Sequence, residues 1–442
     1  MTDSVNTREL ILGILMEVTK EGSYSHLVIR SVLDKYQYLE KKERAFITRV
    51  SEGTIQYMVE LDYIINQFSK VKVNKMKPVI RNILRMSVYQ LKYMDSVPDS
   101  AVCNEAVKLA IHHHFQGLKG FVNGVLRTIA RNKEDLDLSS PYLRYSLPQW
   151  MYSMWEKDWG KENAEKIAES FLKERPVWVR CNFNLASKEE IFASLKDQQV
   201  NVEECPYGDS MLYLSGYDHL EALEAFRNGW IQVQDLSSSL VGMAAAPKEG
   251  SQVLDVCGAP GGKSLHIADL LKGSGHVTVR DLSDYKVQMI EDNIDRSGFS
   301  NISAEIWDAL ELDEELVETM DLVVADLPCS GLGILGKKPD IKNRVKPEDL
   351  DSLAELQREI LSVVWQYVKP GGTLVYSTCT IDKKENEENV AWFQEHFPFE
   401  PVNIEGRLGE KLKAETMKQG YFQILPGVYP CDGFFLSVMK RK

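Results

Sequence analysis

The stretch VLDVCGAPGGKS, residues 253–264, decides the fold of the C-terminal half of the chain. An apolar run leads into a glycine-rich turn and then into a helical pattern, which is how a strand, a tight turn and a helix follow one another in α/β proteins. Further apolar runs of strand length stand at 276–280, 322–325 and 373–376, with helical patterns between them. This alternation predicts an α/β domain over residues 236–442, built on a doubly wound, mainly parallel, Rossmann-like sheet.

The glycine-rich turn is typical of a backbone that passes close to a ligand. A triphosphate-binding loop needs glycine at 257, where Cys257 stands, and a dinucleotide G-x-G-x-x-G pattern is absent. Asp281 ends the second strand-like run, 26 residues after Asp255, where a carboxylate commonly meets ribose hydroxyls. Asp308 follows the third run and is placed for the adenine edge of the same ligand, with an ordinary helix N-cap as the alternative.

Two further motifs each carry a cysteine: DLPCSG at 326–331 and STCT at 377–380. Carbon 5 of cytosine is too poor a nucleophile to take a methyl group until a thiolate adds to carbon 6, and the adduct must later lose its carbon-5 proton. One thiol can add and the other can assist elimination. We expect Cys329 and Cys379 to face each other across the crevice, with Asp326 projecting into it. The alternative for Cys329 is a small buried apolar residue.

The composition is that of a globular protein of two or three domains, with 442 residues and 44% hydrophobic content. The chain lacks a basic and apolar leader and any apolar run near the roughly 20 residues that cross a bilayer, so a cytoplasmic protein without a membrane partner is expected. Its seven cysteines never form C-x-x-C. Neither a disulfide framework nor a metal site is therefore expected.

The formal net charge of −13 is unevenly distributed. Residues 1–135 carry 20 Lys and Arg against 15 Asp and Glu, whereas the remainder carries 32 against 50. A mildly basic front half can attract RNA phosphates, although such charges are more often only solvated helix faces.

Apolar residues recur at helical spacing throughout residues 1–135, which predicts an all-α domain. Three of its segments, RNILRMSVYQL at 81–91, NEAV at 104–107 and FVNGVLR at 121–127, resemble the RNA-binding NusB family. Most of these side chains are expected in the core. The candidates for RNA contact are Arg81, Arg85, Asn123 and Arg127.

Two shorter regions join the halves. Residues 136–175 are rich in proline and aromatic residues and are expected to form a helical connector packed on its neighbours. Residues 176–235 alternate strand-like pieces at 177–182 and 211–214 with a helical piece at 189–195. This pattern predicts a small α+β module.

The motifs together carry a family resemblance. D-x-C-x-A-P-G-G-K at 255–263, D-x-P-C-S-G at 326–331 and S-T-C-T at 377–380, behind a NusB-like front, resemble the Sun (RsmB) group of bacterial RNA cytosine-5 methyltransferases, which modify 16S ribosomal RNA. The resemblance spans essentially the whole chain. Three positions depart from the usual residues of the group: Gly258 and Leu327, where alanine is usual, and Lys286, where arginine is common.

The resemblance implies an S-adenosylmethionine-dependent enzyme that methylates carbon 5 of a cytosine in 16S rRNA. We expect a monomer that binds RNA and not DNA. The resemblance also implies that Cys379 is the nucleophile. For the remaining steps we expect Asp326 to stabilise the base at its N3/N4 edge and Cys329 to remove the carbon-5 proton. The residues implied to line S-adenosylmethionine and the base are Cys257, Gly258, Ala259, Pro260, Gly261, Gly262, Lys263, Asp281, Asp308 and Asp326.

Two other functions stay open on the sequence. One is an RNA-binding protein in which the methyltransferase-like domain has lost its activity, although cysteines stand at both motif positions. The other is an active enzyme of the same core that modifies transfer RNA, since only the NusB-like front favours ribosomal RNA.

Overall fold

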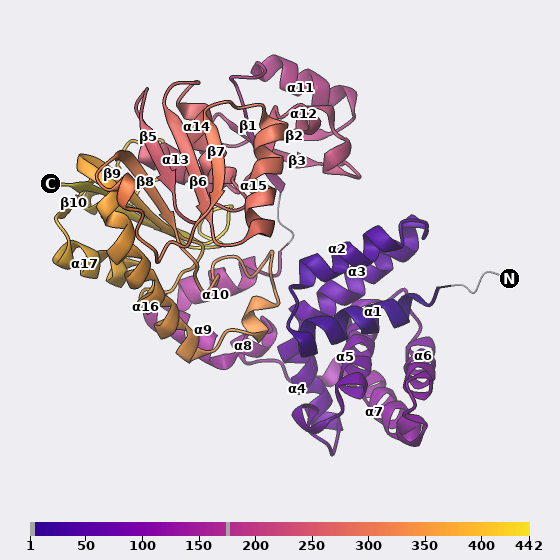
Figure 1. Ribbon diagram of the computed structural model, residues 1–442. Coiled ribbons are helices and arrows are strands. Elements are labelled where there is room, and N and C mark those ends of the chain that lie inside the picture. Colours follow the sequence, from indigo (N-terminus) through magenta and orange to yellow (C-terminus); the bar gives the residue numbers. More distant parts are fainter. Residues whose placement is uncertain (1–4, 174–176) are drawn as a thin grey trace. The chain divides into compact units, whose positions relative to one another are not determined.

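The computed structural model describes residues 5–173 and 177–442 (Figure 1). The chain forms two compact units, one comprising residues 1–172 together with 335–345 and the other comprising 173–334 together with 346–442. Among the described residues, no helix combines the length and the apolar character needed to cross a membrane.

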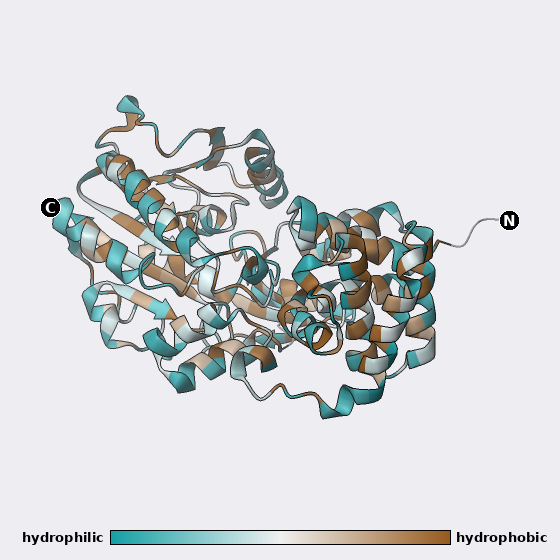
Figure 2. Cartoon of the chain, turned by 90° about the horizontal axis from the view of Figure 1, so that it is seen from below, coloured by the Kyte–Doolittle hydropathy of each residue, from teal (hydrophilic) through white to brown (hydrophobic). Residues whose placement is uncertain are grey.

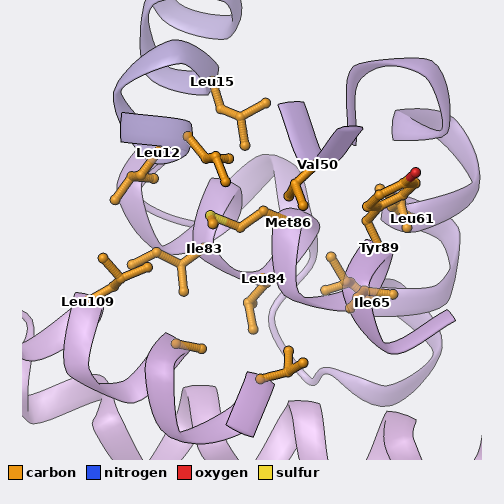
Figure 3. Packing of buried hydrophobic residues seen from close by; sticks show 14 of the residues in the cluster. Leu12, Leu15, Val50, Leu61, Ile65, Ile83, Leu84, Met86, Tyr89 and Leu109 are labelled. Atoms are coloured by element: carbon orange, nitrogen blue, oxygen red, sulfur yellow. The ribbon is translucent and has the colours of Figure 1, made fainter. Parts of the chain in front are cut away.

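The first unit is a bundle of helices, as the apolar spacing predicts. Helix α5 forms its centre, because residues 82–91 are buried without interruption. Figure 3 shows Ile83, Leu84, Met86 and Tyr89 of this helix packed among side chains of α1, α3, α4 and α6. The outward faces of these helices are mainly hydrophilic (Figure 2). The main helices are α1 (Thr7–Met16), α2 (Ser25–Lys35), α3 (Lys41–Gln56), α4 (Met58–Phe68), α5 (Pro78–Tyr93), α6 (Asp99–His112) and α7 (Lys119–Asn132).

The region expected as a connector contains three more helices that belong to the same unit: α8 (Pro141–Arg144), α9 (Gln149–Trp159) and α10 (Lys161–Ser170). Helix α8 packs on α4, and the backbone N–H of Glu60 donates to Ser146 Oγ at 3.2 Å just after α8. The indole ring of Trp155 is fully buried and contacts Phe171. These contacts make the region a packed part of the helical unit.

Segment 335–345 also belongs to the helical unit, which the sequence did not indicate. Lys342 is 2% exposed, and its Nζ donates to the carbonyl of Gln56 at 2.6 Å. Asn343 Nδ2 donates to the carbonyl of Ile55 at 3.2 Å. The segment therefore donates hydrogen bonds to carbonyls in the last turn of α3, where the regular helical donors run out.

The small α+β module predicted after the helical region is present in the second unit. Its sheet has the order β2-β3-β1-β4, all antiparallel, and two helices accompany it. Arg180 on β1 is buried and donates through Nη1 to Asp269 Oδ2 at 2.9 Å, which ties the module to the larger sheet domain. The elements are β1 (Val177–Cys181), α11 (Lys188–Asp197), β2 (Asn201–Glu204), β3 (Met211–Ser215), α12 (Glu224–Arg227) and β4 (Ile231–Val233).

The larger sheet is the predicted doubly wound one. Its order is β10-β12-β9-β8-β5-β6-β7, with β11 paired to β12. Strands β5 to β9 are parallel to their neighbours, and β12 is antiparallel to β9. The strands are β5 (Gln252–Asp255), β6 (His276–Asp281), β7 (Ile302–Ile306), β8 (Met320–Asp326), β9 (Val368–Thr378), β10 (Phe399–Pro401), β11 (Tyr421–Ile424) and β12 (Phe434–Arg441).

Helices cover both faces of this sheet, so its strands are apolar on both sides. Alternate residues of one strand enter different cores: Val253 packs with α13 and α14, whereas Leu254 packs with α16. The helices are α13 (Leu236–Ala245), α14 (Gly262–Leu270), α15 (Asp284–Ser297), α16 (Pro347–Val364) and α17 (Glu387–His396). The chain leaves β5 toward β6 on one side and returns as β8 on the other, and such a switch point is where ligands bind in open α/β sheets.

Candidate active site

The glycine-rich turn after β5 is held close to β6. A Cβ atom on Gly258 would lie 2.3 Å from Val279 Cγ1, so the alanine usual at this position in the resembled group would not fit without movement of Val279. Gly261 adopts a φ of +98°, a region that favours glycine. Ser264 Oγ donates to Asp255, and burial raises the pKa of Asp255 to about 6. Asp255 is thus a buried support of the turn.

Asp281 lies at the end of β6 beside this turn. Its Oδ2 accepts from the backbone N–H of Ala259 at 3.1 Å, and its Oδ1 forms an ion pair with Lys286 Nζ at 2.9 Å. Asp308 follows β7, and its Oδ1 accepts from the backbone N–H of Leu310 at 3.0 Å. This bond closes a turn and does not cap a helix. Both carboxylates lie at the carboxyl edge of the sheet, as expected from the spacing.

The other predicted turn residues support this arrangement. The backbone N–H of Cys257 donates to Asp255 Oδ1 at 3.4 Å, and burial raises the pKa of its thiol well above the usual range. A cis peptide bond joins Ala259 to Pro260, whose carbonyl accepts from Asn293 Nδ2 at 2.9 Å. Gly262 begins α14. Because its pKa is raised by burial, Cys257 is a neutral thiol.

Lys263 does not point to a free phosphate site. Its Nζ forms an ion pair with Asp326 Oδ2 at 2.5 Å and lies 5.4 Å from the centre of the Phe434 ring. Burial alone would lower the pKa of Lys263, but the neighbouring carboxylate of Asp326 raises it. Asp326 Oδ1 also accepts from Ser377 Oγ at 2.7 Å. The strand-end carboxylate is thereby oriented by two partners.

The two cysteines lie together, as predicted from adjacent strands. Strands β8 and β9 pair in parallel up to Asp326 and Ser377, and Leu327 N–H continues the ladder to the Ser377 carbonyl at 3.1 Å. The Sγ atoms of Cys329 and Cys379 are 3.3 Å apart. The hydrogen bond to Cys379, together with burial and the nearby Glu385, raises the pKa of Cys329 well above its usual range.

The charges around the two thiols differ in sign. The thiolate form of Cys379 interacts favourably with the ammonium of Lys263, whereas Glu385 is the anion beside Cys329. A nearby cation stabilises a thiolate and a nearby anion destabilises it. The surroundings of Cys329 therefore favour its thiol form.

A buried polar network holds both cysteine loops from behind, and no sequence motif pointed to it. Glu385 accepts from the backbone N–H of Ser330 at 2.9 Å, and Ser330 Oγ lies 2.7 Å from Thr380 Oγ1. Gln357 on α16 donates to the carbonyl of Pro328 and to Glu385, both at 2.9 Å. Glu385 stands in a charged run that suggests a solvated face, and its position six residues after Cys379 is the one signal that could have located it.

The four candidate RNA contacts lie in three different surroundings. Arg85 is occupied, because its Nε and Nη2 donate to the two carboxylate oxygens of Asp62 at 2.6 Å each. Arg81 has a buried Nε without a hydrogen-bond partner among the described residues. Asn123 and Arg127 line an open groove along α6 and α7. In the part of the chain that the structure describes, no three His, Cys, Asp or Glu side chains are grouped to hold a metal ion.

Family models match the chain in three regions. The model described as 16S rRNA methyltransferase RsmB/F matches residues 242–440, the NusB family model matches 5–131, and a ferredoxin-like domain model of RsmF/B-like methyltransferases matches 147–218. These matches confirm the expected helical, α+β and methyltransferase parts.

Relatives match the chain from end to end. A protein of Bacillus subtilis named probable ribosomal RNA small subunit methyltransferase B is 39% identical, with 99% of each chain covered. Ribosomal RNA small subunit methyltransferase B of Klebsiella pneumoniae is 29% identical over 100% of both chains. Among solved structures, PH0851 is 25% identical with a TM-score of 0.84, and it covers 99% of both chains. NSun6 from Pyrococcus horikoshii, solved with SFG, shares the fold of 66% of this chain at 21% identity and a TM-score of 0.59.

Proposed function

Because this chain belongs to the RsmB/F family of 16S rRNA methyltransferases, we propose that it transfers a methyl group from S-adenosylmethionine to carbon 5 of a cytosine in 16S rRNA, through a covalent adduct with Cys379. The observation that carries this proposal is the 3.3 Å separation of Cys329 Sγ and Cys379 Sγ at the carboxyl edge of the sheet. Two thiols at one site match the two steps, addition and elimination, that cytosine carbon 5 requires.

The turn after β5 and the neighbouring carboxylates fit S-adenosylmethionine. Gly258 and Gly261 bring the backbone close to the strand ends, where a bulky nucleoside must pass. Asp281 Oδ2 accepts one hydrogen bond from the chain, which leaves acceptor capacity for ribose hydroxyls. We assign Asp308 to the adenine edge. The bound cofactor supplies a methyl group on a positively charged sulfur.

Addition begins at Cys379. The thiolate of Cys379 attacks carbon 6 of a cytosine that is unstacked or single-stranded. A sulfur–carbon bond forms, and the electron pair of the carbon 5–carbon 6 double bond makes carbon 5 nucleophilic toward the methyl group. Asp326, already oriented by Lys263 and Ser377, accepts from the amine at the N3/N4 edge of the base.

Elimination completes the reaction. Cys329 first gives its own thiol proton to solvent and then, directly or through a water molecule, takes the carbon-5 proton, so one proton is released for each methyl group transferred. The electron pair of the carbon–hydrogen bond restores the carbon 5–carbon 6 double bond. The bond to carbon 6 breaks, and Cys379 leaves as a thiolate.

The domain assignment is also part of the proposal. We assign RNA binding to residues 1–135, packing support to 136–175 and 176–235, and cofactor binding and chemistry to 236–442, in a monomeric cytoplasmic protein.

Bisulfite sequencing tests the function directly. The purified protein, S-adenosylmethionine and a 16S rRNA transcript should leave one cytosine resistant to bisulfite conversion, and the reaction without the cofactor should leave none. Methylation of another base, or of transfer RNA in a parallel reaction with no change in the 16S transcript, would contradict the proposal.

A further inference from the structure

A cavity of about 300 Å³ in the helical unit has a polar lining that the proposed chemistry does not use. One wall is the end of α1, where residues Glu17–Glu21 form a turn of π-helix, a conformation that is frequent at functional sites. A second wall is α5, through Arg81 and Arg85, and a third is segment 340–344. This volume is at the small end of ligand pockets.

The lining is strongly basic. Among the residues that the structure describes, it contains Lys20, Arg81, Arg85 and Arg344 against one carboxylate, Asp340. Two of these cations have their charge matched elsewhere, because Lys20 pairs with its neighbour Glu21 and Arg85 pairs with Asp62. The two remaining cations are Arg81 and Arg344, and because Arg344 pairs with Asp340, the unmatched positive charge of the cavity comes mainly from Arg81.

Within the part of the chain that the structure describes, Arg81 is the cation of the lining that has a hydrogen-bond donor without a partner. Its Nε is buried and has no hydrogen-bond partner among the described residues. Burial and the neighbouring Arg85 lower the pKa of Arg81, and the carboxylate of Asp62, which is paired with Arg85, compensates its charge only in part. A buried donor without a partner is destabilising, so such a group usually has a ligand or a functional role.

Arg344 is held in place on the opposite wall. Its Nη1 lies 3.3 Å from Asp340 Oδ2, and its guanidinium lies 4.6 Å from the centre of the Tyr24 ring. Asp340 is itself engaged, because its Oδ1 accepts from Ser25 Oγ at 2.5 Å. Arg344 is thereby fixed by contacts that leave other donors of its planar fork for a ligand.

We propose that this cavity binds a phosphate group of the RNA backbone, with Arg81 and Arg344 as its cations. The planar donor fork of arginine matches phosphate oxygens. The identity of the phosphate as RNA rests on the proposed function, and free phosphate shares the same chemistry. The cavity is not formed by the NusB-like helices alone, since segment 340–344 follows the Cys329 motif in the chain.

RNA affinity measured over a range of salt concentrations tests the site. With a 16S rRNA transcript, Arg81→Ala should weaken binding about fivefold to tenfold and reduce the slope of log affinity against log salt by about 0.7 to 1. Arg81→Lys keeps the charge and should preserve most of the slope. Arg30→Ala is the matched control, because this α2 arginine is 71% exposed and lies outside the cavity; it should change neither quantity.

Inorganic phosphate distinguishes the two sources of the ligand. At constant ionic strength, phosphate should raise the melting temperature of the wild type, not that of Arg81→Ala, and should compete with RNA only in the wild type. If only the phosphate effect depends on Arg81, the site binds a free anion and the proposal is wrong. It is equally wrong if neither measurement depends on Arg81.

Two further measurements distinguish a phosphate site from a structural role of Arg81. Arg81→Ala without phosphate should not lower the melting temperature, because the Nε of this side chain makes no hydrogen bond within the described residues; a clear loss would show a structural role and overturn the proposal. Methyl transfer by the wild type to the same transcript is measured separately. If it occurs while Arg81 has no effect on RNA binding, the phosphate site is wrong and the proposed function stands.

Discussion

At the scale of single residues, the two active-site cysteines share one hydrogen bond but differ in their charged neighbours. Lys263 lies on the side of Cys379, and Glu385 on the side of Cys329. A thiolate is the nucleophilic form of cysteine, whereas a thiol of raised pKa becomes a strong base once it loses its proton. This asymmetry is the physical reason for giving attack to Cys379 and proton removal to Cys329.

The two cysteines should therefore give opposite phenotypes when replaced. Cys379→Ala removes the attacking thiolate, so methyl transfer should fall by at least about a thousandfold and no covalent complex should form. Cys329→Ala leaves attack and methyl transfer possible but slows release by about 10²- to 10⁴-fold. Methylated RNA should then accumulate on the protein as a complex that survives denaturing electrophoresis.

Cys103→Ala is the control for this pair, because Cys103 is a buried cysteine of the helical unit, remote in the sequence from both motifs. It should methylate RNA like the wild type. A stable adduct on the Cys379 variant and none on the Cys329 variant would reverse the two roles.

The residues proposed to act on the base could be predicted from the sequence, whereas the buried residues that hold their loops in place could not. Cys329, Cys379 and Asp326 stand in short motifs at strand ends, where local pattern and topology define their position. Glu385 and Gln357 act through contacts between segments 28 residues apart, and no local periodicity reveals such a contact. A charged run normally indicates solvent exposure, and here it contains a buried carboxylate.

At the scale of elements, the side-chain contacts of the strand, turn and helix at 252–270 indicate whether the turn suits a nucleoside triphosphate or a nucleoside without phosphates. The tail Gly262-Lys263-Ser264 is like that of a triphosphate-binding loop, but Lys263 is bound to Asp326 and Ser264 donates to Asp255. Neither side chain is free for a triphosphate and its magnesium ion. The turn is consequently suited to a nucleoside without phosphates.

Calorimetry should accordingly detect binding of S-adenosylmethionine and its demethylated product, and no binding of ATP. Asp281→Ala should weaken binding of the cofactor at least about tenfold, because a hydrogen bond to a charged group contributes roughly 1.5–3 kcal/mol. Asp284→Ala, three residues further on an exposed face, is the matched control. ATP binding without binding of the methyl donor would overturn the cofactor assignment.

A second element, segment 335–345, places an unusual lysine at the end of α3. Burial lowers the pKa of Lys342 to about 7, although its Nζ donates to the Gln56 carbonyl. In the unfolded chain this pKa is about 10.4. Between these values the unfolded state holds a proton that the folded state lacks, so the stability of the helical unit rises with pH from about 7 to about 10.

The difference in unfolding free energy between Lys342→Met and the wild type isolates this effect, because other titrating groups are common to both. The methionine variant should be most stable relative to the wild type below pH 7, where Lys342 of the wild type is charged in both the folded and the unfolded state. The difference should then shrink by up to about 1.4 kcal/mol per pH unit as the pH rises to 10. Urea unfolding at several pH values gives this difference, and a difference that does not change with pH would contradict the burial of a titrating Lys342.

At the scale of the whole molecule, helix spacing and strand alternation predicted the helical, α+β and parallel-sheet parts, because each depends on a period that is visible within a few residues. The membership of segment 335–345 in the helical unit depends on packing between residues nearly 300 apart, such as Lys342 and Gln56, and no such period marks it. A deletion of residues 1–135 would therefore also uncover Lys342. Substitution in the intact chain is the cleaner test of RNA binding.

The exposed groove between α6 and α7 provides that test. Lys108, Lys119 and Arg127 line it with one acidic neighbour, Glu105. Because a chain of net charge −13 can attract RNA only through local basic surfaces, we expect these cations to contact phosphates. Replacing all three by alanine should lower RNA affinity at least about tenfold and reduce the salt slope by about 2, at about 0.7 for each single-strand phosphate.

The matched control replaces Lys411, Lys413 and Lys418, three exposed lysines of the other unit, by alanine. Both triple variants carry the same net charge, so a difference between them reports position and not total charge. The control should keep the RNA affinity and salt slope of the wild type, and both variants should bind S-adenosylmethionine normally. If the two triple variants lose RNA affinity equally, the attraction is a property of the average charge, and the helical unit has no RNA-binding groove along α6 and α7.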